Sequence, residues 1–170
     1  MTNVERVYNE LLISKFEQLE DYINQANEIL ESNDTAKAER YCQRVIAVFS
    51  NEIQYLEYKL DATSSEPYTE DRPIDYMGDL EILKEKLINY QIELQEKAAN
   101  ITLDKLQSSE LSESERNEIE NMVRELIQKS KAGEPSKNVA SKIFSWLADK
   151  GGDALVQMIP LIASGALLRG

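Results

Sequence analysis

Histidine is absent from the sequence, which also contains only one cysteine, Cys42, and one tryptophan, Trp146. Without histidine the commonest general base, the serine and cysteine triads that use it, and most zinc sites are excluded. With one cysteine no disulfide can form within the chain, which is typical of a reducing compartment. Because Cys42 lies between Ala38 and Val45 on an apolar helical stripe, we interpret it as a core residue rather than a nucleophile.

Long apolar runs and leader signals are also absent. The longest uncharged stretch, residues 154–168, has fifteen residues, fewer than the roughly 18 that suggest a spanning helix. The first ten residues, MTNVERVYNE, hold neither a basic n-region nor an apolar h-region. We therefore expect no signal peptide and a cytoplasmic location.

Motifs for catalysis and for cofactor binding are missing as well. The sequence contains no G-x-x-x-x-G-K and no G-x-G-x-x-G, so no phosphate-binding loop is indicated. The acidic residues between 66 and 79 lack the D-x-D-x-D-G pattern of a calcium loop, and we interpret them as a solvated loop. We expect no enzyme, no bound metal and no cofactor.

The charge is strongly acidic and unevenly distributed. The 31 acidic residues exceed the 19 basic ones, which gives a net charge of −12. Such a surface repels phosphate backbones, so direct binding of nucleic acid is not expected. Residues 137–170 hold four basic and two acidic residues, a net charge of +2, which leaves −14 for residues 1–136. The sequence thus predicts two chemically different parts.

Apolar residues spaced three and four apart predict four main helices in the acidic part. The first two span about 3–31 and 35–61 and are joined by the turn signal SNDT, which favours an antiparallel hairpin. After a polar loop at 62–75, the third spans about 77–99. The fourth, 113–131, begins at the capping box Ser112-x-x-Glu115.

The C-terminal residues 136–170 predict a short apolar helical pair. Ser136 is the expected cap of its first helix, which ends at Gly151-Gly152, and Asp153 is the expected cap of the second, over 154–168. The predicted fold is all-α: a long antiparallel hairpin, extended to a four-helix bundle-like core in residues 1–131, plus this pair. The coiled-coil-like spacing favours oligomers, although helix faces buried within one chain explain the same spacing.

Residues 119–162 combine a capped helix, a Pro-Ser break, an apolar helix containing WLADKG and a final apolar segment. In this pattern the segment resembles the C-terminal region of small, uncharacterised all-helical bacterial proteins, some of them encoded near mobile-element or defence genes. The resemblance implies an accessory or defence-related role in a bacterium or phage. It implies no catalytic residue.

The function that these features favour is a non-enzymatic helical protein–protein interaction or assembly protein. Its partner would be another protein or a second copy of the chain. We expect the apolar tail to dock through Phe144, Trp146, Leu147, Leu155, Ile159, Leu161 and Ile162. Because tyrosine is enriched in interface hot spots, Tyr55, Tyr58 and Tyr76 form a second candidate surface.

Two alternatives remain open from the sequence. Residues 136–170 are apolar and slightly basic and place Phe144 and Trp146 near lysines, as segments at membrane interfaces do. A membrane-active effector working through this tail is therefore the first alternative, although fifteen residues make only ~22 Å of helix. The second is an acidic inhibitor that mimics nucleic acid, which the charge of residues 1–136 permits.

Overall fold

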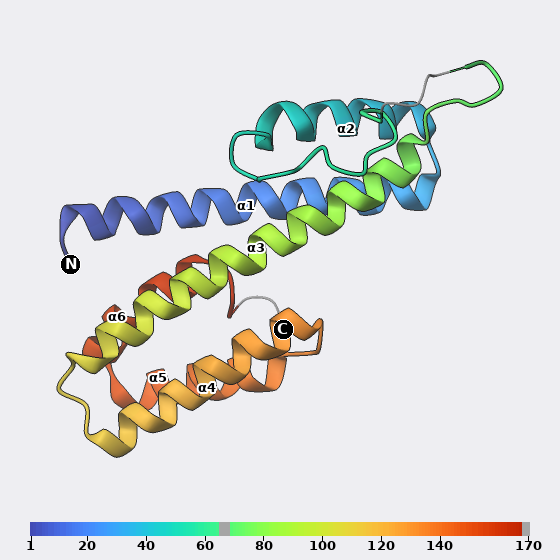
Figure 1. The fold of residues 1–170 in the computed structure, drawn as a ribbon. Coiled ribbons are helices and arrows are strands. Elements are labelled where there is room, and N and C mark those ends of the chain that lie inside the picture. Colours follow the sequence, from blue (N-terminus) through green and yellow to red (C-terminus); the bar gives the residue numbers. More distant parts are fainter. Residues whose placement is uncertain (65–68, 168–170) are drawn as a thin grey trace. The chain divides into compact units, whose positions relative to one another are not determined.

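The computed structural model describes residues 1–64 and 69–167, and these form six α-helices and no β-strand (Figure 1). The predicted all-α fold is confirmed. The helices are α1 (Asn3–Ser32), α2 (Thr35–Phe49), α3 (Tyr76–Gln107), α4 (Glu113–Ala132), α5 (Lys137–Lys150) and α6 (Gly152–Ala163). The predicted end of the last helix, Leu168, lies outside the described residues, as does part of the predicted loop 62–75.

Contacts group the chain into two compact units. Unit 1 comprises Met1–Glu17 and Gln91–Gly170, and unit 2 comprises Gln18–Tyr90. Composition placed a boundary between residues 131 and 136, whereas the contacts place both sides of that boundary within unit 1. Helix α4 packs on α5, and α5 packs on α6. The acidic and apolar stretches therefore share one core.

Unit 2 is built on the predicted antiparallel hairpin of α1 and α2 (Figure 1). Asn33 makes the turn in the left-handed conformation, with φ 52°. Asp34 caps α2 by accepting a hydrogen bond from the Lys37 amide, 3.1 Å away. The buried side chains of unit 2 are Leu19, Ile23, Ala26 and Ile29 of α1, Ala38, Tyr41, Cys42, Val45 and Phe49 of α2, Leu56 and Leu60, and Leu80, Leu83 and Leu87 of α3.

Aromatic rings join the two helices of the hairpin. Tyr22 on α1 meets Phe49 and Tyr41 on α2 edge-on, with ring centroids 5.3 Å and 6.1 Å apart. The Tyr41 hydroxyl donates a hydrogen bond to the Tyr22 carbonyl at 2.9 Å. Burial raises the pKa of Tyr41, so this hydroxyl stays protonated as a donor.

The second predicted helix, 35–61, is too long, because α2 ends at Phe49. Residues 50–64 form turns, in which Tyr55 and Lys59 are left-handed with φ 58° and 69°. Leu56 and Leu60, the last members of the apolar stripe, are nevertheless 2% exposed. The stripe thus correctly marked buried positions, but tertiary contacts to α3 replaced the helix that the spacing predicted.

The third predicted helix, 77–99, is too short. Helix α3 continues to Gln107. Leu103 and Leu106 are buried there in the core of unit 1. Burial of an apolar face stabilises the extra turns, as it does for most helices in proteins.

The apolar tail lies inside unit 1 and supplies much of its core. The main cluster joins Ala99, Leu103 and Leu106 of α3, Ile119, Val123, Leu126 and Ile127 of α4, Val139, Ala140, Ile143, Trp146 and Leu147 of α5, Ala154, Met158 and Leu161 of α6, and Ala166 and Leu167. Helix α6 begins at Gly152, so Asp153 lies in its first turn rather than at the cap. Ser136 precedes α5 without a side-chain cap bond.

Two capping boxes in unit 1 are each reinforced by a lysine of another helix. At α4 the Ser112 hydroxyl accepts from the Glu115 amide, and the Glu115 carboxylate accepts from the Ser112 amide, as predicted. Thr2 and Glu5 repeat this arrangement at α1. The Glu115 carboxylate also pairs with Lys150 at 2.8 Å, and that of Glu5 with Lys105 at 2.9 Å.

Gly165, in the turn after α6, permits a close approach of the tail to α1. Its φ is +77°, and a Cβ atom added there would overlap the ring of Phe16. Beside it, Ala163 packs with Leu12 and Ala98 in a second small cluster. The small residues of the tail thus let the backbone lie against α1 and α3 within unit 1.

We predict that Gly165→Ala strongly destabilises unit 1. The left-handed backbone costs a non-glycine residue about 1–2 kcal/mol, and overlap with Phe16 adds about 1–3 kcal/mol as overpacking. Gly133→Ala is the matched control, because Gly133 has φ +69° but no neighbour within 4 Å of an added Cβ. Urea denaturation measures both. Equal destabilisation by the two variants would contradict the close packing of Gly165 on Phe16.

The two capping-box glutamates predict a pH dependence. Hydrogen bonds from Lys105 and from Thr2 lower the pKa of Glu5 to about 2, and those from Lys150 and from Ser112 lower the pKa of Glu115 to about 2. A carboxylate whose pKa falls on folding contributes stability that is complete above the unfolded value, about 4.5, and is lost as pH falls toward 2. Carboxyl NMR titration should give both low values, and Lys105→Met should raise only that of Glu5.

Candidate functional site

Residues 50–64 of unit 2 form a loop in which two non-glycine residues adopt a backbone conformation that is rare for residues with a Cβ atom. Two of its residues, Tyr55 and Lys59, adopt the left-handed conformation, which costs a residue with a Cβ atom about 1–2 kcal/mol. Such conformations persist only where the surroundings enforce them, and they gather at functional sites. The contacts that enforce this one come from two residues of α3, Lys86 and Asp79.

The ammonium group of Lys86 holds three carbonyl groups of the loop. Its Nζ atom donates to the carbonyl oxygens of Tyr55 at 3.0 Å, Leu56 at 2.8 Å and Tyr58 at 2.6 Å. A lysine ammonium has three donors, so these carbonyls match its full capacity. Burial, together with the positive charge of Lys59 nearby, lowers the pKa of Lys86.

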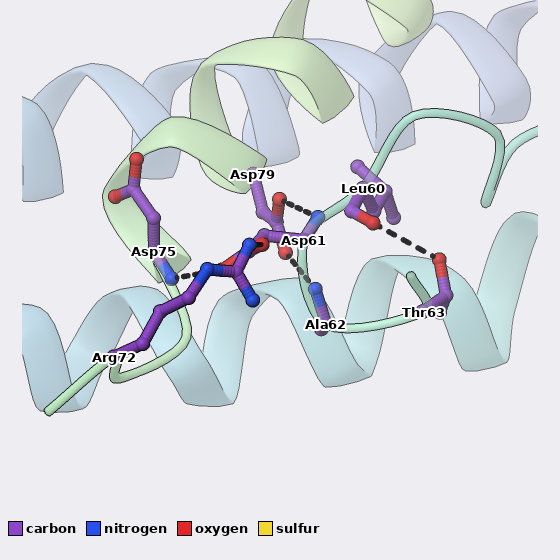
Figure 2. Close-up of polar contacts among 7 residues, drawn as sticks. All are labelled: Leu60, Asp61, Ala62, Thr63, Arg72, Asp75 and Asp79. Carbon is purple, nitrogen blue, oxygen red and sulfur yellow. Dashed lines mark hydrogen bonds and ion pairs between the residues drawn. The ribbon is translucent and has the colours of Figure 1, made fainter. Parts of the chain in front are cut away.

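Carboxylates bind the backbone at the end of the loop (Figure 2). The buried carboxylate of Asp79 accepts from the amides of Asp61 at 2.6 Å and Ala62 at 2.9 Å. That of Asp61 accepts from the Asp75 amide at 2.8 Å and pairs with the Arg72 guanidinium at 2.9 Å. Because these oxygens already satisfy backbone and arginine donors, the aspartates fix the loop rather than present free ligands.

A hollow of about 800 Å³ opens beside the held loop. Tyr58, Lys59 and Leu60 line one part of it, and Arg72 and Pro73 line another. The aspartates of Figure 2 line it as well. The hollow therefore combines apolar side chains with charges of both signs.

The loop displays two of the three tyrosines that the sequence singled out. The side chains of Tyr55 and Tyr58 are 74% and 65% exposed, and the Lys59 ammonium lies 5.6 Å from the centre of the Tyr58 ring. Tyr76, at the start of α3, is half-buried. Sequence reasoning missed Lys86, because nothing in its local pattern distinguishes it from the solvated charges of a helix. It was wrong for Asp79, which it counted among the acids of a solvated loop, because this carboxylate is buried against the amides of Asp61 and Ala62.

The predicted docking residues of the tail divide between core and surface. Trp146, Leu147 and Leu161 are buried in unit 1, and Ile159 and Ile162 are half-buried. Phe144 and Leu155 are 43% and 47% exposed. Most of this set thus packs within its own unit, and Phe144 and Leu155 are its two exposed members.

Cys42 has the surroundings of a structural cysteine. It is 2% exposed, and its thiol donates to the Tyr76 carbonyl at 3.6 Å. Burial, with a smaller contribution from the charge of Asp79, raises the pKa of the thiol to about 12. Because the thiolate is the reactive form, this environment disfavours nucleophilic chemistry at Cys42.

Within residues 1–64 and 69–167, no three metal-ligating side chains gather into a group that could hold a metal ion. No helix in these ranges is long and apolar enough to cross a membrane. Comparison of the chain with models of protein families, with curated proteins and with solved structures finds no match.

We predict that Lys86→Met loosens the loop at residues 50–64. Methionine keeps an apolar stem but removes the donor of the Leu56 and Tyr58 carbonyls, whereas the Tyr55 carbonyl keeps the Tyr58 amide at 3.1 Å. The free energy of unfolding should therefore fall by about 2–3 kcal/mol. Lys84→Met is the control, because none of the described residues pairs with this half-buried neighbour on α3. Hydrogen exchange of the loop amides should accelerate in Lys86→Met alone. Equal exchange in both variants would contradict the proposed role of Lys86.

Proposed function

We propose that this protein is a non-enzymatic helical interaction protein that docks a protein partner through Tyr55 and Tyr58. The observation that carries the proposal is the display of these two exposed rings on a loop that Lys86 and Asp79 hold in place. The partner is another protein or a second copy of the chain. A cytoplasmic, bacterial or phage setting, including a role in defence, is a further part of the proposal and depends on the sequence alone.

The energetics of tyrosine support this choice of surface. A tyrosine offers a large contact area and a hydroxyl while freezing only two side-chain torsions, and it is enriched among interface hot spots. The backbone of Tyr55 and Tyr58 is already ordered by the Lys86 ammonium. A preorganised loop loses less conformational entropy on binding, so more of the contact energy appears as affinity.

The surroundings of the rings also suit a protein surface. Glu57 and Lys59 flank Tyr58 with opposite charges, which gives the apolar centre a polar border, as interfaces have. The hollow beside Tyr58 and Lys59 offers space for a side chain of the partner. A mixed border of this kind fits a protein better than it fits a polyanion such as nucleic acid.

The tail contributes less to this proposal than the sequence analysis expected. Only Phe144 and Leu155 of its candidate residues are well exposed. Trp146, the residue that would anchor a membrane-active tail at an interface, is 6% exposed. We therefore rank the tyrosine pair above the tail, while the membrane-active and nucleic-acid-mimicking alternatives stay predictions of the sequence.

We predict that the double variant Tyr55→Ala/Tyr58→Ala loses its specific partner without losing its fold. Truncating hot-spot residues costs more than 1 kcal/mol each, so affinity should fall at least roughly tenfold. Quantitative affinity enrichment from cells that produce the protein, together with light scattering for self-association, measures the loss. Lys86→Met should weaken the same complex, although Lys86 itself would not touch the partner.

Phe144→Ser/Leu155→Ser is the matched control, because it removes exposed apolar side chains from unit 1 and leaves the tyrosines intact. A complex that survives this change and not the tyrosine change supports the proposed surface. The reverse result would place the interface on the tail. A protein that is monomeric and binds no partner in any form would contradict an interaction function altogether.

A further inference from the structure

A groove in unit 1, distinct from the tyrosine loop, lies along the seam between α3 and α4. Contacts at both ends show that α4 runs back beside α3: the Arg116 guanidinium donates to the Gln107 carbonyl at 3.1 Å, and Lys131 pairs with Glu96 at 2.6 Å. Between these contacts opens a groove of about 300 Å³. This volume is at the lower end of the range for ligand sites, about 300–1,000 Å³.

The floor of the groove is apolar and belongs to the core of unit 1. It consists of Ala99 and Leu103 from α3 and Val123 and Ile127 from α4, none of them more than 9% exposed. Ala99 keeps the floor deep, because a longer side chain at this position would project into the groove. An apolar body of a ligand would here displace water from an apolar surface, which is favourable.

The rim of the groove carries one positive charge, on Arg124, that has no ion-pair partner among the described residues. At one end Glu96 and Lys131 neutralise each other. Arg124, also on the rim, is exposed, and no carboxylate of the described residues pairs with its guanidinium. The remaining polar groups of the rim are the neutral amides of Asn100 and Gln128. In a chain of net charge −12, this groove therefore has a net positive rim.

We propose that this groove binds a small amphiphilic carboxylate, with its apolar body on the floor and its carboxylate on Arg124. Guanidinium and carboxylate groups match in geometry and form paired, charge-assisted hydrogen bonds. The single unpaired cation fits one negative charge. The lining offers no cluster of backbone amides of the kind that cradles the phosphates of a nucleotide. The small volume excludes long lipids from full burial.

Isothermal titration with octanoate tests the proposal on the full chain, with octylammonium and octanol as probes of equal chain length. Octanoate should bind, octanol should bind more weakly, and octylammonium should not bind. Arg124→Gln should weaken octanoate binding at least about tenfold, as loss of a hydrogen bond to a charged group does. Lys97→Gln is the charge-matched control, because Lys97 is exposed on α3 and does not line the groove.

A second variant tests the floor independently of charge. Ala99→Leu should abolish octanoate binding by filling the groove, while its circular dichroism and melting curve show whether unit 1 remains folded. The proposal is overturned if octanoate does not bind, if octylammonium binds equally well, or if Arg124→Gln binds octanoate as tightly as the unaltered protein. None of these results bears on the tyrosine surface, because the two sites lie in different units and share no residue.

Discussion

The ammonium group of Lys86 binds the carbonyl groups of Leu56 and Tyr58, and it shares the Tyr55 carbonyl with the Tyr58 amide. The order of the loop at residues 50–64 depends on this contact. Helix α2 ends at Phe49, and the residues that follow form turns through which Leu56 and Leu60 still reach the core. A lysine on α3 thus holds the last part of the predicted helix 35–61 as an ordered loop.

The composition of the C-terminal residues of unit 1 is explained by packing. Their lack of charge suggested a role in docking or at a membrane, but Met158, Leu161, Ala166 and Leu167 pack in the core beside α3, α4 and α5. The glycine and alanines that interrupt the apolar run allow close packing, as the contact between Gly165 and Phe16 illustrates. Most of the uncharged stretch is buried in this core, although Leu155 and Val156 remain 47% and 41% exposed.

Several carboxylates of the protein accept hydrogen bonds that stabilise its fold. Asp61 and Asp79 satisfy backbone amides, and Glu5 and Glu115 satisfy capping amides and lysines. These carboxylates thus stabilise the fold. The side chains that we propose to bind a partner or a ligand do not stabilise the fold in this way. They are the exposed rings of Tyr55 and Tyr58 and the unpaired guanidinium of Arg124 beside its apolar groove.

The sequence by itself determined the all-α class, the start of each helix to within a few residues, the capping box at Ser112 and most buried positions. These features follow from periodicity and from hydrogen bonds that span only three or four residues. The tertiary structure alone decided where α2 ends, which helices share a core, and where a groove and an ordered loop appear. Each depends on contacts between residues far apart in the chain, such as Lys86 with Tyr58 or Glu96 with Lys131, and no local pattern encodes such pairings.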